Sequence, residues 1–439
     1  MLARCRASLI GPMGVPRRIR IGGRSAALAT VLVAAPVLAM GSLTAVAVAQ
    51  PPPGAGPVPG AAFRFGAEAA KSLVAIGAWS GETDPVALSR DATRRDLVRL
   101  LGPLMKLPAG ATGAPWRDIA ADDPDGAAAR RAVERRWLTT TAGQVTLDQP
   151  VTGLQADRAF TLALGMSKAV ARMSHFHDDA GRTFTLPPGF GVAITAREAG
   201  LRRNYPASDD ALERTDQQPI RLADLVLMAS RARAIRLSGI PRAVRSLEAF
   251  SIPAIDPAVA PLVQRALTLV GNPYVWGGEW PNPASPLDPQ AAGGFDCSGF
   301  IWYVWRTGDR QAEASLNVPD GRTTYTMNVG TRGTKIPVAQ ASAGDLVFFG
   351  DRGPKTPDSN ASHVSISLGN QWIIHSSGGR AGLSITYVPT YWPQGVQDAR
   401  TFRVSAAPAP VAPPPTAAAV PAAQQPPPPP PGPQPPPPA

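Results

Sequence analysis

Cys297 is the only cysteine of the chain beyond residue 49, because the other of its two cysteines is Cys5. A secreted chain with one cysteine cannot form an internal disulfide, so no disulfide framework constrains this fold. Its 439 residues, 44% of them hydrophobic, are enough for two or three domains with cores of their own. The thiol of Cys297 is then a buried inert group, an intermolecular bridge or a nucleophile.

Residues 1–49 predict a secretory signal. Arg17, Arg18, Arg20 and Arg24 precede an apolar stretch over 25–48, and the stretch closes on Ala47-Val48-Ala49. The alternative is a retained membrane anchor, but Pro36 and Gly41 interrupt the apolar run and favour cleavage. The pair Arg17-Arg18 leaves both Sec and twin-arginine export open. We expect a secreted protein in the cell wall or a periplasm-like envelope space, touching the membrane only through an uncleaved leader.

The net charge does not indicate a nucleic-acid partner. Six arginines and no acid lie in the first 49 residues, so the remainder carries only +5 of the formal charge of +11. No cluster of basic and aromatic residues supports nucleic-acid binding, and a small positive excess suits an anionic envelope polymer.

Composition divides the rest of the chain. A Pro/Gly linker over 50–62 leads into a mainly α-helical domain over 63–250, and a second linker begins at Ile252. Residues 256–405 have the alternating apolar runs of strands, and 406–439 form a Pro-rich tail that we expect to be disordered and extended.

The helical domain contains a weak internal repeat. The segments 83–101, 147–160 and 215–226 each consist of a polar turn, a short extended piece and an amphipathic helix, and this spacing predicts stacked helical units. The pattern loosely resembles S-layer-homology modules, which implies attachment to a cell-wall polymer. The alternative is an unclassified helical domain.

His175, His177, Asp178 and Asp179 could be interpreted as metal ligands. No other cysteine or histidine is close in sequence, so we expect a structural or solvated loop. We predict neither a metal nor another cofactor.

Four short motifs follow one another in the strand-rich domain. They are Gly271-Asn272-Pro273-Tyr274-Val275-Trp276-Gly277-Gly278, then Phe295-Asp296-Cys297-Ser298-Gly299-Phe300, then Ala343-Gly344-Asp345-Leu346-Val347-Phe348-Phe349, then the run from Ser362 to His375. Apolar residues continue past Cys297, so a helix there places the thiol in its first turn. The amides and the dipole of a helix start favour a thiolate and can hold an acyl oxyanion.

The run from His363 to His375 predicts a β-hairpin. A three-residue loop, Gly369 to Gln371, pairs Leu368 with Trp372 and puts both histidines on one face, within reach of each other. A two-residue loop puts them on opposite faces. We therefore predict a register in which His363 is the base for Cys297 and His375 orients His363.

In this order, the motifs resemble the NlpC-type, papain-like cysteine peptidases of bacterial cell walls. The resemblance covers about 256–404. It implies an α+β papain-like fold with the cysteine helix on an antiparallel sheet, Cys297 as nucleophile, His363 as base and His375 as the third polar residue. It also implies that Tyr274 lies beside the thiolate and that Asp296 and Ser298 bind substrate.

Two features depart from the family pattern. A Pro-rich insert over 279–294 precedes the cysteine motif, and Arg322-Thr323-Thr324 matches the family's Arg-Thr-Ser segment only approximately.

The resemblance implies a secreted peptidoglycan endopeptidase that cuts stem peptides, typically between D-glutamate and diaminopimelate. The alternatives are a non-catalytic cell-wall-binding protein and a related thiol amidase or acyl transferase.

Overall fold

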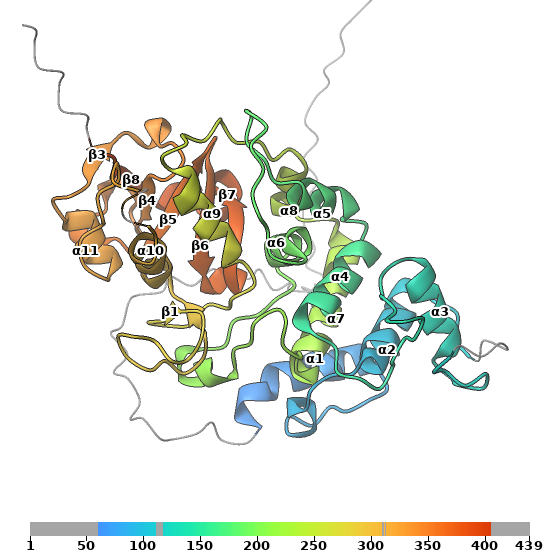
Figure 1. The fold of residues 1–439 in the computed structure, drawn as a ribbon. Coiled ribbons are helices and arrows are strands. Elements are labelled where there is room, and N and C mark those ends of the chain that lie inside the picture. The colour runs from blue at the N-terminus through green and yellow to red at the C-terminus, as the bar shows by residue number, and fades with distance from the viewer. Residues whose placement is uncertain (1–59, 111–116, 310, 312, 405–439) are drawn as a thin grey trace, which may run out of the picture. The chain divides into compact units, whose positions relative to one another are not determined.

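The computed structural model describes residues 60–110, 117–309, 311 and 313–404 (Figure 1). The predicted leader, almost all of the first linker and the Pro-rich tail lie outside these residues. Within the described part, no helix is both long enough and apolar enough to span a bilayer.

The first half of the described chain is helical, as predicted. Its helices are α1 (Arg64–Val74), α2 (Arg94–Met105), α3 (Gly126–Glu134), α4 (Gly153–Ala163), α5 (Ser167–Ser174), α6 (Phe190–Glu198), α7 (Leu222–Ser238) and α8 (Arg242–Glu248). Side chains cap two of them: Thr93 and Thr152 each accept from the third residue of α2 and α4, respectively. Such caps fix where a helix begins.

The internal repeat has a structural counterpart. The short extended pieces before α2, α4 and α7 hydrogen-bond to one another in a closed ring: Ala92 N–H donates to Ile220 O, Ile220 N–H to Val151 O, and Val151 N–H to Ala92 O, over 2.8–2.9 Å. Three equivalent segments therefore meet at one point, from which their helices depart. This arrangement does not decide whether the segment is an S-layer-homology domain, which stays a prediction.

Helix α6 is the central helix of this half. All nine of its residues are buried, including Arg197 and Glu198, and it contacts α4, α5, α8 and β7 (Gly382–Tyr387). The predicted linker after Phe250 is also packed, since Ile252 and Ile255 are buried. Side chains from 63–250 and from 256–404 share one hydrophobic cluster. Their division into two domains stays a prediction.

The second half is built on an antiparallel sheet, in agreement with the predicted fold class. The sheet order is β3-β8-β4-β5-β6-β7, formed by β3 (Thr334–Ile336), β8 (Val396–Thr401), β4 (Leu346–Phe349), β5 (His363–Gly369), β6 (Trp372–Ser377) and β7. The surrounding elements are α9 (Ala260–Thr268), the two-stranded β1 (Glu279–Trp280) and β2 (Gly294–Phe295), α10 (Cys297–Arg306), α11 (Thr324–Val329) and α12 (Val388–Tyr391).

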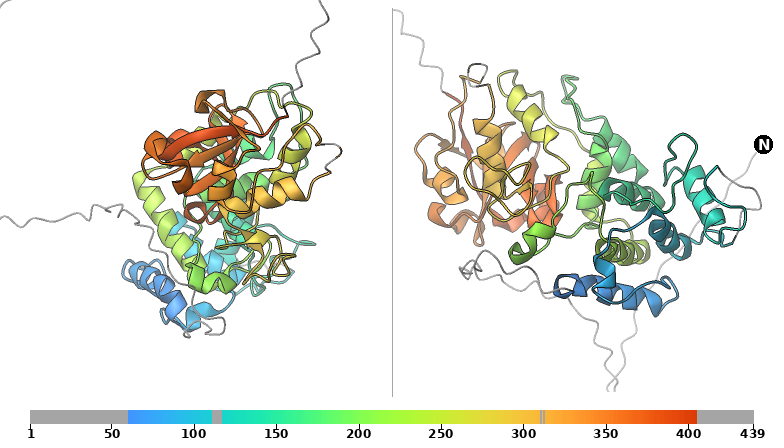
Figure 2. Two further views of the ribbon diagram at one scale, coloured as in Figure 1. Left: turned by 90° about the vertical axis from the view of Figure 1, so that its left-hand side faces the viewer. Right: turned by 60° about the horizontal axis from the view of Figure 1, so that its bottom comes forward.

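Helix α10 packs on this sheet against β5 and β6, with α9 beside it (Figures 1 and 2). Strand alternation separates the side chains of the sheet into two sets. Val364, Ile366 and Ile374 join the core that contains Phe300 of α10, whereas Phe349 and Ile373 belong to a second cluster. By the same alternation, the side chains of His363 and His375 lie on the face of the sheet that carries Phe349 and Ile373.

The turn between β5 and β6 differs from the predicted one, although the register agrees. Asn370 and Gln371 form a two-residue loop, and Gly369, not Leu368, pairs with Trp372. A bulge at Leu368 adds one residue to β5, so Ile366 still pairs with Ile374. The bulge therefore restores the face shared by His363 and His375, which a two-residue loop alone would have lost.

Gly369 is required by this turn, and replacing it by alanine should destabilise the protein. Its φ is +85°, and an added Cβ would lie 2.6 Å from Cδ of Pro253. We expect Gly369→Ala to lower the free energy of unfolding by about 1–3 kcal/mol, measured by urea denaturation. Gly165→Ala is the matched control, because Gly165 has a φ of +78° with open space around it. Equal losses in the two variants would show that the contact with Pro253 is unimportant.

Candidate active site

Cys297 is the first residue of α10, as predicted, and is 8% exposed. The side chain of Asp296 caps this helix by accepting from Gly299 N–H. The sulfur lies 3.5 Å from Oγ1 of Thr324, which begins α11. The backbone N–H of Val364, the residue after His363, also donates toward the sulfur. The thiol therefore lies at the junction of α10, α11 and the start of β5.

Burial opposes the preference for a thiolate that was predicted from this helix start. Burial, reinforced by the negative charge of Asp296, raises the pKa of Cys297 to about 11. Hydrogen bonds from Thr324, Val364 and Ser298 lower this pKa but do not outweigh the loss of hydration. The resting side chain at neutral pH is a thiol.

Asp296 and Ser298 are engaged inside the protein. The guanidinium of Arg322 lies 3.3 Å from Oδ1 of Asp296, donates to Oγ of Ser298 over 3.0 Å, and pairs with Glu279 over 2.8 Å. It also donates to the carbonyls of Gly277 and Gly278. Arg322 thus ties the loop before the insert to the helix start. The proposed binding of substrate by Asp296 and Ser298 stays a prediction.

The insert 279–294 is a closed loop. Its ends pair as β1 and β2, and the side chain of Gln290 bonds the backbone of Glu279, Trp280, Ala292 and Gly294. Trp280 packs edge-on against Tyr303 of α10, with ring centroids 4.8 Å apart. The loop is therefore held against α10 by both hydrogen bonds and an aromatic contact.

The two histidines lie side by side and hydrogen-bond directly, as the predicted register requires. Nε2 of His363 is 2.8 Å from Nδ1 of His375. His375 is fully buried and His363 is 9% exposed. Burial lowers the pKa of His363 to about 4 and that of His375 well below its ordinary value. Both rings are neutral at pH 7, so each has one N–H donor and one acceptor nitrogen.

Aromatic side chains enclose this histidine pair. The ring of Tyr391 is 4.7 Å from that of His375 and 5.9 Å from that of His363, and Phe349 lies 5.6 Å from His363. The hydroxyl of Tyr391 bonds Ser377 over 3.2 Å. This apolar wall is the cause of the low histidine pKa values, because it removes water from the imidazoles.

Tyr274 lies next to the end of β6, where an added Cβ on Gly378 would meet its ring at 3.6 Å. Burial, followed by the negative charge of a Cys297 thiolate, raises its pKa. Its carbonyl accepts from Nδ2 of Asn204 over 2.8 Å. The helical half of the chain therefore contacts the loop that carries Tyr274.

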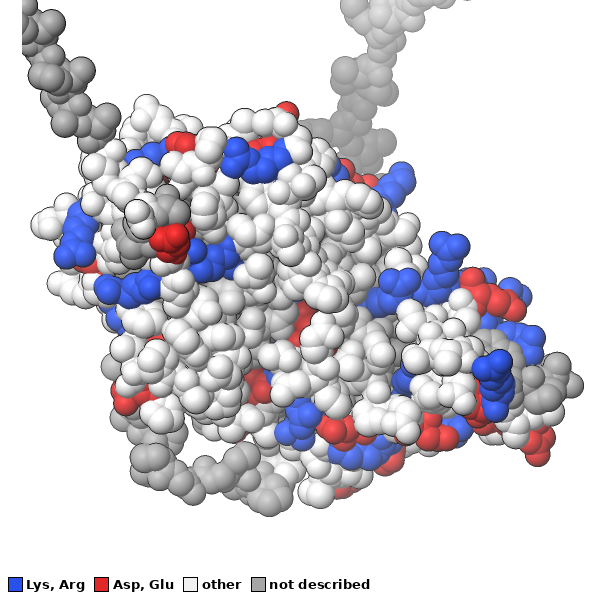
Figure 3. Space-filling view, viewed as in Figure 1, with Lys and Arg blue, Asp and Glu red and all other residues white. Residues whose placement is uncertain are grey.

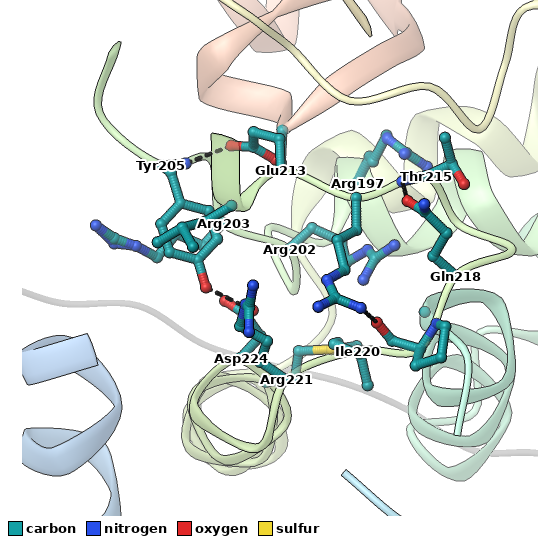
Figure 4. Close-up of a pocket in the computed structure, with 16 residues that line it drawn as sticks. Arg197, Arg202, Arg203, Tyr205, Glu213, Thr215, Gln218, Ile220, Arg221 and Asp224 are labelled. Carbon is teal, nitrogen blue, oxygen red and sulfur yellow. Dashed lines mark hydrogen bonds between the residues drawn. The ribbon is translucent and has the colours of Figure 1, made fainter. Parts of the chain in front are cut away.

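The helical half also has a charged pocket of its own (Figure 4). Arg197 makes a bidentate pair with Asp216 over 2.7 and 2.8 Å, and Arg202 reaches the same carboxylate over 2.6 Å. The cavity of about 40 Å³ has room for water but not for a substrate. Arg197 and Arg202 are paired with Asp216 within the protein, and the Arg197 pair fixes the end of α6.

The residues considered as metal ligands make structural contacts. The buried carboxylate of Asp178 accepts from the backbone N–H groups of Ala180, Arg182 and Ile255, and His177 lies 3.0 Å from Arg172. In the described part of the chain, no group of three or more His, Cys, Asp or Glu side chains could hold a metal ion.

Sequence reasoning missed several residues around the thiol and the histidines. Thr324 and Arg322 belong to the segment that was noted only as an approximate match to the family. No sequence motif distinguishes Tyr391 or Thr386. Glu198 lies in the helical half, 99 positions before Cys297. No local signal in the sequence connects Glu198 with the histidines.

Comparison with known proteins identifies the second half of the chain. Residues 271–401 match the model of the NlpC/P60 family. The probable peptidoglycan endopeptidase LytE of Bacillus subtilis is 35% identical over 145 residues, which are 33% of this chain and 34% of LytE. The peptidoglycan endopeptidase RipB of Mycobacterium tuberculosis is 30% identical over 133 residues, 30% of this chain and 48% of RipB. The chain thus spans less than half of either relative.

Two solved structures are also similar. The NlpC/P60 domain of the peptidoglycan hydrolase SagA is 31% identical, with a TM-score of 0.24, over 32% of this chain and 96% of that one. RipD of Mycobacterium tuberculosis, described as a non-catalytic NlpC/P60 domain protein, is 23% identical, with a TM-score of 0.25, over 34% of this chain and 98% of that one. The family resemblance predicted from the four motifs is confirmed: this chain carries an NlpC/P60 domain at residues 271–401.

Proposed function

We propose that this protein is a secreted peptidoglycan endopeptidase that hydrolyses an amide bond of stem peptides, between D-glutamate and diaminopimelate. The observation that carries the proposal is the hydrogen-bonded pair His363–His375 together with a thiol at a helix start, whose sulfur accepts from the backbone N–H of Val364, the residue after His363. The match to the NlpC/P60 family, and its similarity to proteins named as peptidoglycan endopeptidases, support the choice of substrate.

The proposed reaction begins from the neutral pair. Since Nε2 of His363 faces His375, its Nδ1 is the nitrogen left to take the proton from the thiol of Cys297. The sulfur then attacks the amide carbon, and the protonated His363 gives its proton to the leaving amine as the C–N bond breaks. Water, deprotonated by the same His363, attacks the thioester and releases the carboxylic acid and the free thiol.

Two features of the site lower the activation free energy of these reaction steps. Backbone N–H groups at the start of α10 can stabilise the oxyanion that forms beside Cys297. His375 accepts from His363 and stabilises the imidazolium that exists between the two proton transfers. His375 therefore has the role of the third polar residue.

The rest of the chain positions the enzyme in this proposal. The residues 1–49 direct export, and the helical half binds a cell-wall polymer. Acidic and basic side chains are interspersed on the face shown in Figure 3, where they gather over α2 and α3. A mixed surface of this kind suits contact with a polymer that carries charges of both signs better than contact with a nucleic acid.

A non-catalytic wall-binding role is the alternative that one observation favours, because the thiol is buried and has a raised pKa. A thiol amidase or an acyl transferase would use the same three residues but yield other products. Product analysis separates these possibilities.

Incubation of purified peptidoglycan with the full chain should release new stem-peptide fragments, identified by mass spectrometry. The Cys297→Ala variant should lose this activity by more than about 1,000-fold, because the nucleophile is removed. Cys5→Ala is the matched control and should retain it. Binding without cleavage by the wild type, across muropeptides of different stem chemistry, would favour the wall-binding role.

The thiolate of Cys297 should be absent at neutral pH. Its ultraviolet absorbance, taken as the difference between wild type and Cys297→Ser, should appear only above pH 9 and be half complete near pH 11. The reason is that burial raises the pKa, so the proton is retained until the solution is strongly alkaline. Full thiolate absorbance at pH 7 would instead indicate a resting thiolate–imidazolium pair and contradict the mechanism above.

A further inference from the structure

The histidine pair continues into a chain of hydrogen bonds that leaves the sheet. Nε2 of His375 lies 3.1 Å from Oγ1 of Thr386 on β7, and the Thr386 hydroxyl donates to Oε1 of Glu198 over 2.6 Å. Glu198 is the last residue of α6 and comes from the helical half of the protein. The chain therefore joins the proposed base to a carboxylate far away in sequence.

We propose that Glu198 is a positioning residue, which acts through Thr386 to fix the tautomers of His375 and His363 so that Nδ1 of His363 is free to accept the proton of Cys297. The effect of Glu198 on the reaction rests on the proposed thiol hydrolysis. The assignment of the tautomers rests only on the hydrogen bonds.

The direction of each hydrogen bond follows from Glu198, the group at the far end of the hydrogen-bond chain. Arg380 forms an ion pair with Glu198, with its Nε 2.9 Å from Oε1, and its positive charge favours the ionised carboxylate. The hydroxyl of Ser384 donates to the same oxygen over 2.8 Å. Oε1 is therefore an acceptor, so the single hydroxyl proton of Thr386 points to Glu198.

The donor of each next hydrogen bond, from Thr386 toward His363, can then be assigned in turn. Since the Thr386 proton is used, its oxygen can only accept from His375, and His375 must have its proton on Nε2. Nδ1 of His375 is consequently the acceptor, and His363 must donate from Nε2. A neutral His363 with its proton on Nε2 has an unshared pair on Nδ1. The nitrogen left over is the one that the reaction needs.

The surroundings make this assignment firm. Glu198 is 3% exposed, and Thr386, Ser384 and His375 are fully buried, so water does not compete for these hydrogen bonds. Burial raises the pKa of Glu198, and Arg380 opposes that rise. A proton on Oε2, which has no hydrogen-bond partner among the described residues, would leave Oε1 an acceptor. The direction of the chain is therefore the same for the carboxylate and for the acid protonated on Oε2.

The end of α6 is fixed by a separate interaction. Arg197, directly before Glu198, is paired bidentately with Asp216, and both side chains are almost completely buried. A bidentate ion pair restricts orientation as well as distance. The helical half thus contributes an immobilised carboxylate to the site, which gives it a role in the reaction apart from binding the wall.

The test compares Thr386→Val with Ser384→Ala in the full chain. Both variants remove one hydroxyl that donates to Glu198 Oε1. Ser384 is the backbone partner of His375 across the β6–β7 ladder, but only the Thr386 hydroxyl hydrogen-bonds the imidazole. In the protein with ¹⁵N-labelled histidine, wild type and Ser384→Ala should show His375 and His363 protonated on Nε2. Thr386→Val should lose this preference at His375. Unchanged tautomers in Thr386→Val, or a proton on Nδ1 of His375 in the wild type, would overturn the assignment.

The kinetic arm measures kcat/KM for stem-peptide release. Thr386→Val should lower it by about 10- to 100-fold, as removal of an orienting partner does elsewhere, while Thr386→Ser and Ser384→Ala stay close to wild type. In a His375→Ala background, Thr386→Val should have almost no further effect, because the hydroxyl acts through His375. The same loss in both backgrounds would make Thr386 a merely structural residue and contradict the proposal.

Glu198 is tested in the same way. Glu198→Gln keeps an acceptor oxygen and should retain the tautomers, whereas Glu198→Ala should not. If Glu198→Ala fails to fold, Thr386→Val still decides the question. Absence of hydrolysis by the wild type would defeat the proposed function, and the ¹⁵N measurement would still test the hydrogen-bond chain.

Discussion

The hydrogen bond between His363 and His375 depends on the register of one hairpin. Side chains on a strand alternate between faces, so a shift of one residue would place the two rings on opposite sides of the sheet. The bulge at Leu368 keeps them together, and Gly369 makes the bulge sterically feasible. The geometry of the proposed base is therefore set at a turn whose Gly369 is six residues away from either histidine.

Burial decides the electrostatics of the site. The helix start and its hydrogen bonds act to lower the pKa of Cys297, but the loss of hydration and the neighbouring Asp296 charge have the larger effect. The same loss of hydration keeps His363 and His375 neutral. A neutral thiol and a neutral imidazole can exchange a proton within the site, and the hydrogen-bond chain to Glu198 determines which ring nitrogen receives it.

Much of this could be predicted from the sequence, because the relevant signals are local. The apolar run after Cys297 predicted α10, the alternation around His363 and His375 predicted a hairpin, and the four motifs predicted the family. The two-residue turn was not predicted, since a bulge leaves no pattern of its own. The high pKa of Cys297 was missed because burial depends on the packing of the whole fold. Glu198 was missed because its partners, Thr386 and Ser384, are distant in sequence and carry no motif.

In the proposed reaction, Cys297 forms a thioester with the acyl part of a stem peptide. The most direct measurement is acid quenching of the full chain during turnover of a soluble muropeptide, followed by mass spectrometry of the peptide that contains Cys297. We expect Cys297 to carry a mass increment equal to the acyl half of the cleaved substrate. Product formation without this adduct, or an adduct on another residue, would contradict the proposed reaction.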